Sequence, residues 1–129
     1  SGLAVTALDG APGIYSARFA GAEGDDAANN TELLRRLTGV PDEQRTAFFY
    51  CCLVLLRHAD DPTPVIAEGR WWGRIGHEPV GANGFGYDPL FVLSDRGMTS
   101  AQLPPEEKQR LSHRGQAMTA LRQRLETGW

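Results

Sequence analysis

The sequence predicts a mixed α/β protein with a largely antiparallel sheet and flanking helices. Two long β-rich runs, 45–58 and 65–75, are joined by a proline-rich turn, which is the pattern of a long hairpin. Helix signals lie on both sides of this hairpin, over about 25–38 and 112–127. Helices before and after paired strands indicate a sheet with helices packed beside it.

The first forty residues predict a strand, a loop and a helix. Residues 3–8 alternate well enough for a short strand. In the glycine-bounded loop at 11–22, Arg18 either clamps an anion or anchors the loop through backbone carbonyls, and we favour anchoring. The helix over 25–38 starts with an aspartate cap, and the asparagines at 29–30 are tolerated near such a cap and are expected to do little more.

The run 45–58 is almost continuously apolar, which predicts a central strand covered on both faces. Its neighbouring Cys51 and Cys52 are interpreted as small buried hydrophobic residues. In the next strand, Trp71 and Trp72 must face opposite ways, so one is expected in the core and the other at an edge or interface.

After the hairpin, the chain is punctuated by glycine and proline over 77–89, followed by a short strand at 90–93. A turn of helix is expected at 99–103, and Pro105 opens another helix. Ser112 caps a last helix, whose buried apolar stripe is expected to consist of Met118, Leu121 and Leu125.

Composition excludes several classes of protein. The 129 residues carry 13 basic and 16 acidic side chains, for a net charge of −3, which argues against a nucleic-acid surface. The longest apolar run, 47–56, is too short to span a bilayer, and no leader opens the chain. Two adjacent cysteines form neither a disulfide framework nor a zinc site. We therefore expect a cytoplasmic domain that handles a small molecule and contacts neither nucleic acid nor membrane.

The segment Gly84–Pro89 is the first candidate site. Its glycines allow close approach of the backbone to a ligand, and Phe85 or Tyr87 offers a flat face for a base. The alternative is a tight loop whose aromatic side chains fill the core, and spacing alone slightly favours that alternative. Asp88 precedes a proline and is expected to order the loop rather than to act in catalysis.

The second candidate site joins Lys108 to the segment 112–115. Lys108 is the single lysine beside twelve arginines, so this position has a use for a compact ammonium. His113 and Arg114 follow the cap at Ser112, where cations oppose the helix dipole, and such a locally unfavourable choice suggests a ligand. The alternative, held equally open, is surface charge paired with the glutamates at 106–107.

Four segments in order, SGLAVTALDGAPGIYSARFAG, GANGFGYDPLF, LPPEEK and SHRGQA, resemble the inosine triphosphate pyrophosphatase family (XTP/dITP diphosphatases). The resemblance implies an elongated two-lobed α/β fold, with Mg²⁺ as cofactor and a homodimeric assembly. It implies hydrolysis of non-standard purine nucleoside triphosphates (ITP, dITP, XTP) to the monophosphate and pyrophosphate. The chain opens at Ser1 without a methionine, so residues 1–129 are expected to be the C-terminal portion of one pyrophosphatase domain that lacks its N-terminal part.

Carried over by motif, the resemblance implies a purine pocket in which Phe85 stacks on the base and His113 and Arg114 read its edge. No catalytic or metal-binding residue is expected within the chain, because the family's acidic residues precede the SGL element. Activity of the chain alone is therefore doubtful on this interpretation. The expected substrate-binding residues are Ser1, Phe85, Gly86, Tyr87, Asp88, Lys108, His113 and Arg114.

Two other functions remain open at this point. The chain can be a non-catalytic nucleotide-binding or dimerisation module. It can also belong to a sibling pyrophosphatase that acts on modified or pyrimidine nucleotides, although the SHRG and GFGYDP motifs argue against that class.

Overall fold

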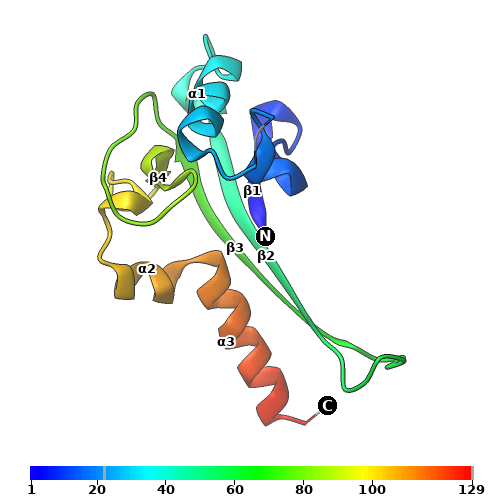
Figure 1. Cartoon of the computed structure of the whole chain (residues 1–129). Coiled ribbons are helices and arrows are strands. Elements are labelled where there is room, and N and C mark those ends of the chain that lie inside the picture. The colour runs from blue at the N-terminus through cyan, green and yellow to red at the C-terminus, as the bar shows by residue number, and fades with distance from the viewer. Residues whose placement is uncertain (22, 129) are drawn as a thin grey trace.

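The computed structural model describes residues 1–21 and 23–128, and its centre is a four-stranded antiparallel sheet. The strands follow one another across the sheet in chain order, β1-β2-β3-β4 (Figure 1). The predicted α/β class with a largely antiparallel sheet is confirmed. The strands are β1 (Gly2–Val5), β2 (Thr46–Leu55), β3 (Val65–Ile75) and β4 (Phe91–Leu93).

β2 and β3 form the long hairpin that the sequence predicted, in register from Thr46 opposite Arg74 to Leu55 opposite Val65. Its far end extends beyond the rest of the sheet (Figure 1). The central position of β2 is confirmed, because β1 and β3 flank it. Short β1 ends at Val5, and the rest of the predicted first strand is a 3₁₀ turn.

The prediction that β2 is covered on both faces is wrong for the described part of the chain. Ala47, Phe49 and Cys51 are buried, whereas Cys52, on the opposite face, is exposed. The buried interpretation of Cys52 is therefore also wrong. Side chains alternate along a strand, so a continuous apolar run does not by itself specify that both faces are packed. The same alternation buries Trp71 and exposes its neighbour by 51%, as predicted for the tryptophan pair.

The described residues form three α-helices beside the sheet: α1 (Asp26–Arg36), α2 (Pro105–Leu111) and α3 (His113–Glu126). The expected caps are present. The Asp25 carboxylate accepts from the Ala28 N–H at 3.0 Å, and the Ser112 hydroxyl accepts from the Gly115 N–H at 3.2 Å. No described helix has the length and apolar character needed to cross a membrane.

α3 runs beside the hairpin (Figure 1), but it does not bury the predicted stripe. Met118 and Leu125 are 54% and 40% exposed, whereas Ala117 is fully buried. The reason lies in β3: a Cβ built at Gly69 would come within 2.1 Å of the His113 carbonyl oxygen. Helix and strand backbones touch here, so small residues line the contact and the larger apolar ones face outward.

A buried arginine joins α1 to the end of the sheet. Arg45 is 3% exposed and donates to the carbonyls of Leu37, Val40, Ile75 and Gly76 at 2.9 to 3.1 Å. Burial lowers the pKa of its guanidinium. Arg18, for which we favoured an anchoring role, has its guanidinium 5.0 Å from the centre of the Tyr15 ring.

Candidate functional site

A cavity of about 180 Å³ opens where β1 and β2 meet the start of α3. Leu3 and Phe49, which face each other across β1 and β2, line it from the sheet. The structure brings together around it all eight residues expected at the site: Ser1, Phe85, Gly86, Tyr87, Asp88, Lys108, His113 and Arg114.

Within the loop Gly84–Pro89, the two aromatic side chains have different environments. Tyr87 is buried, and its hydroxyl donates to the Ser16 carbonyl at 2.7 Å. Burial, with the nearby Asp26 carboxylate, raises the pKa of Tyr87 to about 12. Phe85 remains 59% exposed at the cavity. Both interpretations of this motif are thus present: Tyr87 fills the core, and Phe85 offers an open face.

Asp88 orders the loop, as expected. Its carboxylate is buried and accepts from the Phe85 N–H at 3.0 Å and the Ser100 hydroxyl at 2.8 Å, and it forms an ion pair with Lys108. Gly84 has a φ of +74°, and a Cβ there would lie 2.1 Å from Asp88 Oδ2. The carboxylate therefore occupies the space that only a glycine leaves free.

Two cations surround the Phe85 ring. Lys108 Nζ lies 4.5 Å from its centre and Arg114 Cζ lies 5.2 Å away, which are cation–π distances. Arg114 also donates to the Ser1 hydroxyl at 3.2 Å. The alternative pairing with the glutamates at 106–107 is not seen among the described residues: Glu107 pairs with Arg96 and lies 3.9 Å from Arg110, and no ion pair joins either glutamate to Lys108 or Arg114. In the described residues Arg114 has no carboxylate partner, so its charge remains available to a ligand.

His113 is a buried and neutral member of the site. It is 7% exposed, and its ring stacks on Phe49 with centres 5.0 Å apart and planes inclined by 16°. Burial lowers the pKa of His113 to about 4, and the charges of Arg114 and Lys108 act in the same direction. Its Nδ1 is buried without a hydrogen-bond partner in the described structure. A neutral imidazole offers one donor and one acceptor, so this ring can present either kind of group to a ligand.

Sequence reasoning missed several residues that hold the site together. Asn29 is 2% exposed and ties the loop before α1, because it accepts from the Ala20 N–H at 2.7 Å and donates to the Ala17 carbonyl at 3.0 Å. Asn30 donates to the Gly86 carbonyl at 3.0 Å. The expectation that the two asparagines do little more than tolerate their position is wrong.

No group of three or more histidine, cysteine, aspartate or glutamate side chains that could hold a metal ion lies within residues 1–21 and 23–128. Of the two carboxylates at the cavity, Asp88 is engaged with Lys108 and Ser100, and Asp26 accepts from the Gly86 N–H.

The fold and the site define an α/β protein in which an exposed aromatic ring, two cations and a neutral histidine converge beside an antiparallel sheet. Comparison with known proteins makes this specific. The chain belongs to the Ham1 family, which it matches over residues 1–124.

The relatives support the resemblance first inferred from the four motifs. The dITP/XTP pyrophosphatase of Pseudomonas syringae pv. tomato is 62% identical over 125 residues, which cover 97% of this chain and 63% of that protein. The Ham1-family structure from Coxiella burnetii is 42% identical with a TM-score of 0.93, and the one from Staphylococcus aureus is 40% identical with a TM-score of 0.91. The match to the C. burnetii structure covers 98% of this chain and 64% of that protein. The match to the S. aureus structure covers 99% of this chain and 65% of that protein. The chain thus spans just under two thirds of its relatives' length.

Proposed function

We propose that the chain forms the base-binding part of a nucleoside-triphosphate pyrophosphatase that converts ITP, dITP and XTP to the monophosphate and pyrophosphate. The observation that carries the proposal is the convergence of all eight expected residues on one cavity. The names of relatives such as the dITP/XTP pyrophosphatase of P. syringae support the same reaction. The substrate is a small purine nucleotide, handled without nucleic acid or membrane.

Base selection falls chiefly to Arg114. Hypoxanthine and xanthine present an acceptor oxygen at position 6, whereas adenine presents an amino donor there. Arg114 carries only donors, so an adenine would leave donor facing donor. The neutral His113 can turn either a donor or an acceptor to the base and therefore discriminates less. Phe85, exposed beside both cations, supplies the face on which the purine stacks.

Lys108 binds the substrate from the position that Asp88 gives it. The ammonium has three donors, one of which is directed to the Asp88 carboxylate. The other donors remain for a ligand in the cavity that Lys108 lines. The Asp88 carboxylate is itself held by the Phe85 N–H and the Ser100 hydroxyl, so it fixes the position of the Lys108 ammonium.

We assign Mg²⁺ as the metal of the reaction, where it spreads the charge that develops on the phosphates. Magnesium is commonly held by one or two carboxylates together with substrate phosphates. Because Asp88 and Asp26 both have partners within the chain, no step is assigned here to a metal bound by the described residues. We assign the general base and the remaining phosphate contacts to the segment that precedes the SGL element in proteins of the family.

A pyrophosphate-release assay tests the function. ITP, dITP, XTP and ATP are supplied with Mg²⁺ to this chain and to a fusion in which the part of the P. syringae relative preceding its match is joined before Ser1. We expect the fusion to release pyrophosphate from the first three and to exceed the chain alone. Purine-nucleotide binding with no activity in either protein would favour the non-catalytic module, which the partial coverage of the relatives keeps open.

The assembly is assigned as a cytoplasmic homodimer, on the strength of the family resemblance. Exposed apolar side chains on the hairpin and α3, including Val54, Ile66 and Met118, are compatible with an interface between copies. Light scattering after size exclusion measures the mass directly, and a monomer at micromolar concentration would contradict the assignment.

A further inference from the structure

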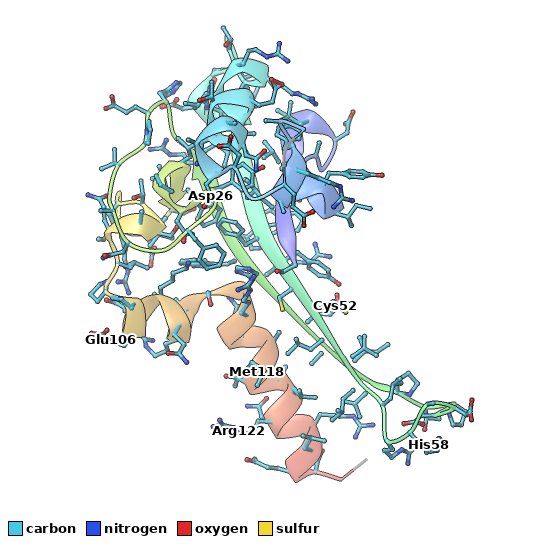
Figure 2. The ribbon with its side chains drawn as sticks, in the orientation of Figure 1. Asp26, Cys52, His58, Glu106, Met118 and Arg122 are labelled. Atoms are coloured by element: carbon cyan, nitrogen blue, oxygen red, sulfur yellow. The ribbon has the colours of Figure 1, made fainter. Side chains whose placement is uncertain are left out.

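The loop that carries Phe85 is attached to α1, a helix to which the sequence gave no part in the site. The Gly86 N–H donates to Asp26 Oδ2 at 2.9 Å, and the Gly86 carbonyl accepts from Asn30 Nδ2 at 3.0 Å. Residues four apart lie on one face of a helix, so Asp26 and Asn30 engage both polar groups of one residue. Figure 2 shows Asp26 at the end of α1 that lies toward the centre of the molecule.

Asn30 is placed here at a local disadvantage. Asparagine is a poor helix former, and this side chain leaves its Oδ1 buried without a partner in the described structure. Its amide is oriented so that Nδ2 faces two carbonyls, those of Asp26 at 2.9 Å and Gly86. A reversed amide would place an oxygen against both carbonyls. The two carbonyls together therefore set the orientation, and in that orientation Nδ2 is available to Gly86.

Asp26 is not needed to begin the helix, because its neighbour does that. The Asp25 carboxylate caps α1 through the Ala28 N–H, whereas the Asp26 carboxylate reaches across to Gly86 and lines the cavity. Two adjacent aspartates thus have separate tasks, one within the helix and one toward the site.

The position of the Phe85 ring depends on this link. Phe85 is 59% exposed and stacks on no other aromatic ring in the described structure; its ring contacts are with the Lys108 ammonium and the Arg114 guanidinium, so core packing does not fix it. Its backbone is fixed instead, on one side by the Asp88 carboxylate and on the other by the held Gly86.

We propose that Asp26 and Asn30 are positioning residues. They fix the backbone of Gly86 through its N–H and its carbonyl, and thereby hold the Phe85 ring in place for a purine before the ligand binds. The inference rests on the proposed function, since it assumes that Phe85 stacks on a base. A ring held in place loses less conformational freedom on binding, which strengthens the affinity without any new contact. The effect should be the same for every purine, because Asp26 and Asn30 act on the stacking platform and not on the base edge.

The experiment compares four variants of the chain: Asp26→Ala, Asn30→Ala, Asp26→Asn and Asp25→Ala. Amide hydrogen exchange at Gly86, followed by NMR, directly reports the clamp, by which we mean the two hydrogen bonds from Gly86 to Asp26 and Asn30. Calorimetry with inosine monophosphate and adenosine monophosphate reports the affinity without turnover, and thermal unfolding reports the stability of the fold. Asp25→Ala is the matched control, because it removes the adjacent carboxylate and weakens the helix start without touching Gly86.

We expect Asp26→Ala and Asn30→Ala each to accelerate exchange at Gly86 and to weaken inosine monophosphate binding about three- to tenfold, the effect of losing one ordinary hydrogen bond. The ratio of the two nucleotide affinities should stay constant. Asp26→Asn retains an acceptor for the Gly86 N–H and should restore most of the affinity. Asp25→Ala should lower the melting temperature and leave the affinity unchanged.

Unchanged Gly86 exchange and unchanged affinity in both alanine variants would overturn the inference. So would an equal loss of affinity in Asp25→Ala, because the effect would then come from helix stability. If the unaltered chain binds neither nucleotide, it is the proposed function that fails, and the exchange measurement still decides whether the clamp exists.

Discussion

The buried histidine of the site should make folding depend on pH in a defined window. The pKa of His113 is lowered to about 4 from its ordinary 6.5, first by burial and then by the positive charges of Arg114 and Lys108; the Asp88 carboxylate opposes them only in part. In the unfolded chain the imidazole takes up a proton near pH 6.5. The folded chain resists that proton until about pH 4, so acid favours unfolding between these two values.

The size of the effect follows from the shift. Each pKa unit corresponds to about 1.4 kcal/mol, so lowering the pH from 7 to 4 should remove about 3 kcal/mol of unfolding free energy through His113 alone. The contribution becomes constant above about pH 7.5, where the imidazole is neutral in both states. That loss is a large part of the 5 to 15 kcal/mol that stabilises a typical domain.

Urea unfolding at pH 7.0, 5.5 and 4.5, for the unaltered chain and for His113→Phe, measures the contribution. The phenylalanine retains a flat ring that can stack on Phe49 but does not titrate. The unfolding free energy of the unaltered chain, relative to that of His113→Phe, should decrease as the pH falls, because acid destabilises only the protein that carries the histidine. Other titrating groups affect both proteins alike and cancel in the comparison.

A pH-independent difference between the two proteins would refute the reasoning. So would a His113 ring that titrates near 6.5 in an NMR titration of the folded chain. Either result would mean that water reaches the imidazole and that the stack on Phe49 does not exclude it. The neutral state assigned to His113 in base recognition would then be wrong as well.

Three further predictions follow from other contacts. In the fusion described above, arginine should not substitute for Lys108, because a planar guanidinium cannot pair with buried Asp88 in the same space. For Lys108→Arg we expect about a 10- to 100-fold loss of kcat/KM for ITP, the size of a charged hydrogen bond, and near-native kinetics would contradict this. In the same fusion, Arg114→Ala should erode the preference for ITP over ATP by about 1–3 kcal/mol, and an unaltered ratio of kcat/KM would remove its role in base reading. Gly69→Ala should destabilise the fold by about 1–3 kcal/mol, because the new methyl group meets the His113 carbonyl; an unchanged melting temperature would show that α3 can shift freely.

Much of the fold was predictable because its signals are local. The hairpin strand 65–75 was predicted with its observed bounds, since proline and glycine mark its ends and apolar residues alternate along it. The start of α3 followed from the Ser112 cap. The motif at 84–89 was a candidate site from the sequence, because its glycines allow close approach of the backbone and Phe85 or Tyr87 offers a flat face.

The rest depends on contacts between residues far apart in the chain, for which the sequence carries no local signal. Nothing near Arg45 indicates that four carbonyls from two segments will surround it. The helical spacing of Met118, Leu121 and Leu125 predicted a buried stripe, but β3 presents Gly69 to α3, which favours small residues at the contact. The link from Asn30 to Gly86 spans 56 positions and could not be inferred from helix propensity.

Phe49 has a consequence for how ligands of this chain can be found. Its ring packs against Phe91 in the core, with centres 4.5 Å apart, and also lines the cavity beneath the site. A ligand that contacts this ring in the cavity can bind only the folded chain, so its binding raises the free energy of unfolding. At a hundred times its Kd, such a ligand should contribute about 2.7 kcal/mol. Melting curves alone can therefore rank a panel of nucleotides, whether or not any of them is turned over.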